Sequence, residues 1–240
     1  MQGEATRTGL QTVTPLLRGT PNVVRAWTDS WNNRRVVASV ITIVMGAGLY
    51  GAAMGWWRGP QQALFVAIKF PLIILLTTCG NAMINSMLAP LLGMNTGLRQ
   101  SFLAVLASFT IAAAILGAFA PLAAFVIWNT APLSSPHALS GVSYNGVQLM
   151  HVSVIAFAGI VANVRLLGLL REIGGNATVA WRVLLSWLAG NLFLGSQLSW
   201  ILRPFIGSPS LPVEFLRKEA FRGNFYESVF RSIVRILHSF

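Results

Sequence analysis

Five long apolar stretches constrain the fold more than any other feature of the sequence. A helix needs about 20 apolar residues to cross the roughly 30 Å hydrocarbon core of a bilayer, since it rises about 1.5 Å per residue. No aspartate or glutamate lies in any stretch that meets this length, and the candidate spans are Val36–Trp57, a segment within Ala63–Leu92, Ser101–Trp128, Val147–Leu170 and Val183–Ile201. The sequence therefore predicts an all-α, polytopic integral membrane protein with about five transmembrane helices.

The charge content supports the same class of protein. Only 10% of the 240 residues are charged, whereas a soluble domain usually carries about 25%. The 17 basic residues outnumber the 6 acidic ones and give a net charge of +11. On membrane helices, such an excess indicates attraction to anionic lipid headgroups. We therefore expect the lipid bilayer, and no nucleic acid, as a partner.

Basic residues near the span ends predict an orientation. The loop 129–146 contains no lysine or arginine, which favours the outside for this loop and the cytoplasm for the N-terminus. The arginines that favour the cytoplasmic side are Arg7, Arg18, Arg25, Arg34, Arg35, Arg99, Arg165, Arg171 and Arg182. Five crossings would leave the basic C-terminal tail outside, and a hairpin near Gly190–Gly195 would return it inside. The side of the C-terminus stays open.

Both ends of the chain carry amphipathic patterns. Residues 1–35 form a basic segment in which Trp27 and Trp31 lie one helical turn apart, as expected for a helix in the membrane interface. The C-terminal segment 204–240 repeats the pattern, with Phe225, Val229, Ile233 and Ile236 on one face. Each of these helices could instead pack on the protein's own core. Between them we expect a membrane domain over residues 36–203.

The second apolar stretch is too long for one straight crossing. Proline is favoured in the first turn of a helix and disfavours a helical residue before it. We therefore expect the crossing to begin at Pro71 and to end before Pro90, with Lys69 at the outer interface and its ammonium group reaching the headgroups. The alternative is a kinked helix with Lys69 at depth, where no acidic residue of the spans could pair with it.

Interhelical contacts are expected at small and amide residues. Gly51 and Gly55 have GxxxG spacing, which suits close packing inside the protein or between subunits. Amide groups in a membrane usually form hydrogen bonds with a neighbouring helix, although they can also line a polar path. The amide residues expected at helix contacts are Asn81, Asn85, Asn163, Asn191 and Gln197. The remaining residues expected at the membrane interface are Trp56, Trp57, Trp200 and Arg203.

Catalytic and metal-binding patterns are not found in the sequence. Cys79 is the only cysteine, and the three histidines, His137, His151 and His238, are far apart, so no zinc spacing occurs. Haem ligation by His151 would need a second histidine facing it across the bundle. We predict no catalytic residue, no metal site and no cofactor.

Three motifs give a resemblance. The combination of "GNAMINSMLAPLLG", "GSQLSWILRPF" and "NFYESVF" is similar to that of uncharacterised bacterial polytopic membrane proteins, and the layout loosely resembles the five-span Yip-type proteins. The resemblance covers roughly residues 34 to 230 and implies a bacterial cytoplasmic membrane. It implies no activity and carries over no site residue.

These observations favour one function over two others. Small-residue faces, interhelical amides and amphipathic ends indicate a non-enzymatic accessory or scaffold subunit that binds other membrane proteins in a larger complex. The alternative is a channel, a lipid-handling protein or a transporter that uses the intramembrane amides. The weakest hypothesis is a membrane enzyme that uses His137 or His151.

Overall fold

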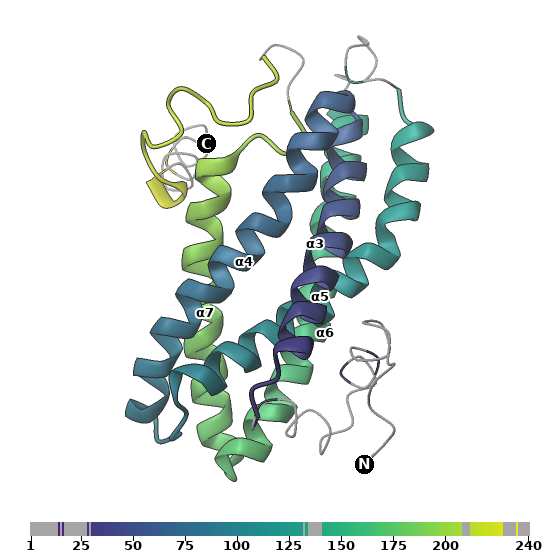
Figure 1. Cartoon of the computed structure of the whole chain (residues 1–240). Helices are drawn as coiled ribbons and strands as arrows, with labels where there is room; N and C mark the ends of the chain where they lie inside the picture. Colours follow the sequence, from purple (N-terminus) through teal and green to yellow (C-terminus); the bar gives the residue numbers. More distant parts are fainter. Residues whose placement is uncertain are drawn as a thin grey trace.

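The protein is a bundle of long helices. The computed structural model describes residues 14, 16, 28, 30–131, 133, 141–207, 212–227 and 234, and these contain no strand. The helices are α3 (Asn33–Trp56), α4 (Pro60–Leu91), α5 (Leu98–Trp128), α6 (Gly141–Gly174) and α7 (Ala177–Leu202) (Figure 1). All five are long and apolar enough to cross a membrane. The expected all-α, multi-pass membrane fold is therefore confirmed.

Local chemistry explains where the helices begin. The side chain of Asn32 accepts hydrogen bonds from the backbone N–H groups of Arg34 and Arg35 at 3.0 and 3.4 Å, which caps α3. Asn176 caps α7 in the same way, by accepting from the N–H of Thr178 at 2.8 Å. Helix α4 begins at Pro60. Proline has no N–H group, and an N–H group in the first turn would have no partner within the helix in any case.

Helix α4 differs from the expectation for the second span. It runs without a break for 32 residues, with Pro71 and Pro90 inside it, so no helix starts at Pro71 or ends before Pro90. Pro71 is buried in the bundle. Proline is tolerated inside membrane helices because neighbouring helices and small local adjustments compensate for the missing backbone hydrogen bond. Proline propensity is a local property, and it therefore predicted the wrong start for this helix.

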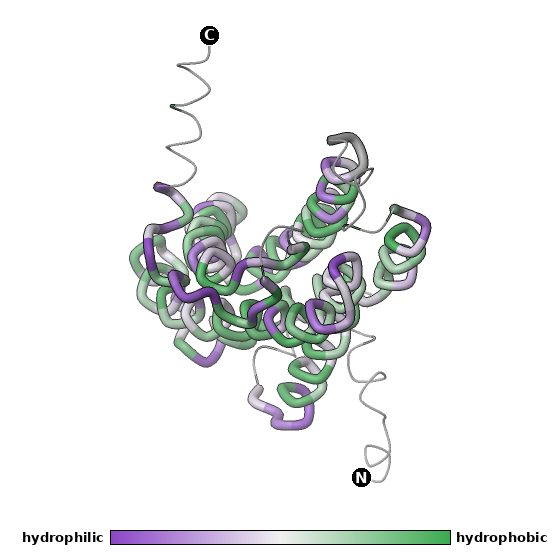
Figure 2. The backbone as a smooth tube through the Cα atoms, turned by 90° about the horizontal axis from the view of Figure 1, so that it is seen from above, coloured by the Kyte–Doolittle hydropathy of each residue, from purple (hydrophilic) through white to green (hydrophobic). Residues whose placement is uncertain are grey.

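Helices α3, α4 and α5 form the tightest part of the bundle. A Cβ atom added to Gly46 of α3 would lie 2.1 Å from the backbone oxygen of Ala113, and one added to Gly117 of α5 would lie 2.9 Å from the Cα atom of Gly46. The backbones of α3 and α5 therefore touch. Helix α6 packs on α5, and α7 packs on α4 and on the C-terminal part of α6 (Figures 1 and 2).

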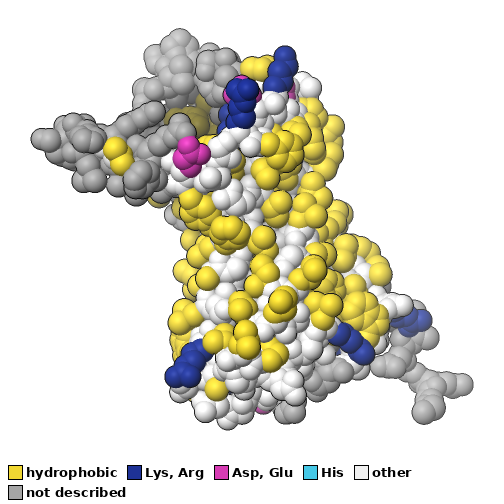
Figure 3. All heavy atoms as spheres, turned by 90° about the vertical axis from the view of Figure 1, so that its left-hand side faces the viewer, with side chains coloured by type: hydrophobic (Ala, Val, Ile, Leu, Met, Phe, Trp, Pro, Cys, Tyr) yellow, Lys and Arg dark blue, Asp and Glu magenta, His cyan; other side chains and the backbone are white. Residues whose placement is uncertain are grey.

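The surface has the pattern of a membrane protein. Apolar side chains cover the middle of the face in Figure 3, and lysine or arginine side chains lie at both of its ends. Large apolar side chains such as Met83 and Met87 on α4 are 63% and 73% exposed. The single cysteine, Cys79, is also exposed on α4. The molecule is a membrane-embedded protein that has many large apolar side chains on its surface.

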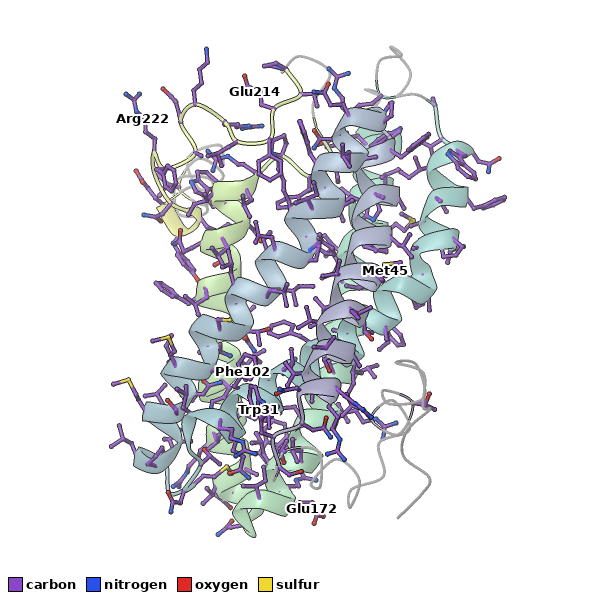
Figure 4. The ribbon with its side chains drawn as sticks, in the orientation of Figure 1. Trp31, Met45, Phe102, Glu172, Glu214 and Arg222 are labelled. Carbon is purple, nitrogen blue, oxygen red and sulfur yellow. The ribbon has the colours of Figure 1, made fainter. Side chains whose placement is uncertain are left out.

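The chain ends are described only in part. Trp31 is 46% exposed, and its ring lies beside Phe102 of α5, with the centroids 6.1 Å apart (Figure 4). Trp27, Val229, Ile233 and Ile236 lie outside the described residues. After α7, residues 212–227 lie at the end of the bundle opposite Glu172, where Figure 4 labels Glu214 and Arg222. Tyr226 of this segment stacks on Phe193 of α7 at 5.8 Å.

Candidate functional site

A hydrogen-bonded amide pair joins α4 to α7. The side-chain nitrogen of Asn81 donates to the side-chain oxygen of Asn191 at 2.6 Å and to the backbone oxygen of Trp187 at 3.4 Å. The pair fits because α7 has a glycine at the contact. A Cβ atom at Gly190 would lie 2.5 Å from the Oδ1 atom of Asn81. The structure thus brings together two of the amides expected at helix contacts, in a contact we call the α4–α7 seam.

The seam continues along α4 as a column of polar side chains. Thr77, Asn81 and Asn85 lie four residues apart, on one face of the helix, and all three are buried. Both amide atoms of Asn85, Oγ1 of Thr77 and Oδ1 of Asn81 have no hydrogen-bond partner among the described residues. Buried polar groups without partners cost free energy, and water commonly satisfies them. The unpartnered atoms make this column the polar part of the α4–α7 seam that lacks internal hydrogen bonds.

Two of the amides lie elsewhere than the sequence indicated. Asn163 is half-buried on α6, and its nitrogen donates to the backbone oxygen of Gly159 in its own helix at 2.8 Å. Gln197 on α7 is half-buried and has no hydrogen bond with a described residue. Among the described residues, neither amide forms a hydrogen bond with a second helix. The amide of Asn163 lies beside open space, since a Cβ atom at Gly159 would have no atom within 4 Å.

The GxxxG glycines are in the interior of the bundle. A Cβ atom at Gly51 would lie 2.7 Å from the backbone oxygen of Val66, and one at Gly55 would lie 2.6 Å from that of Gln62. Both distances are too short for a real contact, so these glycines permit the close approach of α3 to α4. Of the two alternatives that the sequence left open, these glycines therefore serve packing inside the chain.

The side chain of Lys69 is covered by the protein and does not extend outward, contrary to the expectation. Its side chain is 0% exposed, and its Nζ atom donates to the backbone oxygens of Pro204 and Glu214, both at 3.4 Å. The rings of Phe65 and Phe215 lie 6.0 and 5.2 Å from the ammonium group. The chain that follows α7 folds back over α4 and covers Lys69. Backbone carbonyls take the place of the acidic partner that the spans do not offer.

The tryptophans at the helix ends divide into two groups. Trp56 is 47% exposed, as expected at an interface, but Trp57 is only 5% exposed. The indole nitrogen of Trp57 donates to the backbone oxygen of Ala131 at 2.9 Å, and its ring stacks on Tyr144. Trp57 is therefore part of the packing between α3 and α6, which corrects its assignment to the membrane interface.

Trp200 and Arg203 form a contact at the end of α7. Trp200 is half-buried, and the guanidinium group of Arg203 lies 3.4 Å from the centroid of its ring. The same guanidinium donates to the backbone oxygen of Trp200 at 2.9 Å. Burial lowers the pKa of Arg203, and the charge of Arg217 lowers it further. The guanidinium group of Arg203 is thus held against the end of α7.

A buried pair of polar rings joins α3 to α6. The hydroxyl group of Tyr50 lies 2.9 Å from Nδ1 of His151, and His151 is 2% exposed. His151 stands out in the sequence as a polar residue in an apolar span, but nothing in the sequence links it to Tyr50, which is 101 residues away. His137 and His238 lie outside the described residues. Within the described part of the chain, no group of histidine, cysteine, aspartate or glutamate side chains could hold a metal ion.

Comparison of the chain with protein families, with curated proteins and with solved structures gave no match.

Proposed function

We propose that this chain is a non-enzymatic accessory or scaffold subunit that binds another membrane protein in a larger complex. The binding surface is the outer side of α6 around Val152, Ala156, Gly159 and Asn163, which we call the α6 face. The observation that carries the proposal is the amide of Asn163, whose single hydrogen bond goes to its own helix, beside the open space at Gly159.

The chemistry of the α6 face favours a protein neighbour over lipid. Val152, Ala156, Gly159 and Asn163 follow the spacing of one helix face, and Val152 and Ala156 are exposed. Lipid tails offer no partner for the Oδ1 atom of Asn163, whereas a second helix can supply one. Small residues allow two backbones to approach closely. A transmembrane helix of a partner would therefore supply a hydrogen bond to the Oδ1 atom of Asn163 and pack closely against the small residues of the α6 face.

The distribution of burial supports the same proposal. In α3, α4 and α5, between 44% and 56% of the most apolar 18-residue stretch of each helix is buried inside the protein. In α6 and α7 the corresponding shares are 28% and 22%. Helices α6 and α7 thus offer most of their surface to whatever surrounds the bundle, and a partner subunit can occupy part of it.

The proposed location is a bacterial cytoplasmic membrane with the N-terminus in the cytoplasm. The orientation rests on the loop between α5 and α6, which contains no lysine or arginine, and on six arginines near the ends of α3, α5, α6 and α7 on the opposite side of the bundle. These are Arg34, Arg35, Arg99, Arg165, Arg171 and Arg182. Anionic headgroups are the lipid partners that suit such a surface.

The test is a gentle affinity purification of the tagged chain from native membranes, followed by weighing of the intact complex. Gly159→Leu fills the open space on the α6 face. Ala189→Leu is the matched control, because Ala189 is exposed on α7. We expect a stoichiometric partner with the unchanged chain and with Ala189→Leu, and its loss with Gly159→Leu. The proposal would be contradicted if the chain purified alone or as a pure homo-oligomer, or if Gly159→Leu retained the partner.

A second candidate function is a channel, a lipid-handling protein or a transporter, and the unpartnered amide of Asn85 favours it. A water-filled path along the α4–α7 seam would satisfy this amide together with Thr77. The test places Asn85→Cys in a Cys79→Ala chain in sealed vesicles. Reaction with a charged, impermeant thiol reagent from one side, and ion flux that the reagent blocks, would support this candidate. An unreactive cysteine with no flux would exclude it.

A further inference from the structure

Three cations gather where the chain after α7 crosses α4. They are Lys69 of α4, Arg203 directly after α7, and Arg217 further along. We call residues 203–207 and 212–217 the C-terminal strap. Lys69 precedes Asn81 by as many residues as Arg203 follows Asn191, so the antiparallel packing at the α4–α7 seam brings Lys69 level with Arg203. The hydrogen bond from Lys69 to Pro204 agrees with this register.

The three charges are close enough to repel one another. Arg217 interacts electrostatically with both Lys69 and Arg203. Lys69 is 0% exposed, whereas Arg203 and Arg217 are only partly buried. Burial strengthens such repulsion, because the effective dielectric constant of a protein interior is well below that of water. The cluster is therefore costly unless something of opposite charge lies near it.

No carboxylate of the described residues pairs with these cations. Glu214 gives Lys69 only its backbone oxygen, and Glu219 pairs with the exposed Arg222 at 2.8 Å. The partners of Lys69 and Arg203 are instead backbone oxygens and aromatic rings, and the two hydrogen bonds of Lys69 are long, at 3.4 Å each. Neutral groups of this kind offset part of the cost of a buried ammonium group but cannot neutralise three charges.

We propose that Lys69, Arg203 and Arg217 form a binding site for a phosphate-type oxyanion beneath the C-terminal strap. Guanidinium groups match the geometry of phosphate oxygens with two parallel hydrogen bonds, and an ammonium group adds a compact charge. Arg203 uses one terminal nitrogen for Trp200, so its other donors remain for a ligand. The oxyanion can be the headgroup of an anionic phospholipid or free phosphate, since both present the same oxygens.

The experiment measures the thermal unfolding midpoint of the purified full-length chain in a maltoside detergent, which contains no phosphate. One arm titrates inorganic phosphate against chloride at constant ionic strength. The other arm adds phosphatidylglycerol, with diacylglycerol as the control that has the same chains without phosphate. The variants are Lys69→Met and Arg217→Gln. Lys218→Gln is the matched control, because Lys218 is an exposed neighbour on the same segment.

We expect the anion to raise the midpoint of the unchanged chain and of Lys218→Gln, and the apparent affinity to fall roughly tenfold or more in Arg217→Gln. Lys69→Met should also weaken the shift of the midpoint, because it removes the buried ammonium group. Arg217→Gln remains informative if Lys69→Met fails to fold. A response to phosphate identifies a free anion, and a response only to phosphatidylglycerol identifies a lipid headgroup. The proposal is overturned if neither probe shifts the midpoint, or if Lys218→Gln weakens the shift as much as Arg217→Gln.

Discussion

The glycines of α3 are close-packed, whereas those along α6 before its last residue, Gly174, are open. On α3, a Cβ atom at Gly46, Gly51 or Gly55 would collide with the backbone of a neighbouring helix. On α6, a Cβ atom at Gly146, Gly159 or Gly168 would meet no atom within 4 Å. The same residue type thus marks closed helix contacts in one region and an open surface in the other. This difference separates the part that holds the chain together from the part we propose for partner binding.

The strongest test of the difference is Gly46→Ala. Its Cβ atom would lie 2.1 Å from the backbone oxygen of Ala113, so α3 and α5 would have to move apart. We expect a loss of about 3 kcal/mol in the free energy of unfolding in micelles, at the upper end of the usual cost of overpacking. Gly168→Ala on α6 is the control and should be neutral or slightly stabilising, because alanine favours helix over glycine. Equal effects at the two sites would remove the distinction between the regions.

Asn81→Ala tests the α4–α7 seam. The substitution removes the interhelical hydrogen bond to Asn191, and we expect a loss of about 1–2 kcal/mol in the free energy of unfolding. A double-mutant cycle with Asn191→Ala isolates the pair, and the two single effects should not add. Additive effects would show that the two amides do not interact.

Asn85→Ala should have a smaller effect than Asn81→Ala, although both remove a buried asparagine from the same face of α4. The amide of Asn85 has no partner among the described residues, so its removal also relieves a cost of burial. We expect a change within about 1 kcal/mol, measured by the same unfolding method. A loss equal to that of Asn81→Ala would mean that bound water or a ligand holds Asn85.

Gly159→Ala should have the smallest effect. The added methyl group meets no atom of the chain within 4 Å, so the free energy of unfolding of the isolated chain should change by less than about 0.5 kcal/mol. Thermal unfolding in micelles checks this expectation. A clear destabilisation would mean that the α6 face is already in contact with a part of this chain.

The sequence predicted the number and type of helices because hydrophobic length is a local property. It did not predict which amide pairs with which, since Asn81 and Asn191 are 110 residues apart. Asn81 and Asn163 have the same side chain in similar apolar surroundings, and only the position of the neighbouring helices makes one a contact and leaves the other open. Lys69 was misplaced for the same reason, because Pro204 and Glu214 lie 135 and 145 residues away along the chain.

Pro71 illustrates a different limit. The rule that proline starts a helix is sound for an isolated segment, and the apolar run itself was identified correctly. Burial of Pro71 among neighbouring helices outweighs the local preference, and α4 continues past it. The break was therefore predicted from local preference at a position where packing decides the outcome.

Because Cys79 is exposed, its depth in the bilayer can be measured on the native chain. As the only cysteine in the sequence, it can carry one spin label without any substitution, on the outer side of α4. Oxygen partitions into the bilayer centre and water-soluble nickel complexes stay outside, so the ratio of their effects on the label's relaxation reports its depth. That single distance would fix where the bilayer lies along α4, and with it whether Lys69 and the C-terminal strap stand in the headgroup layer.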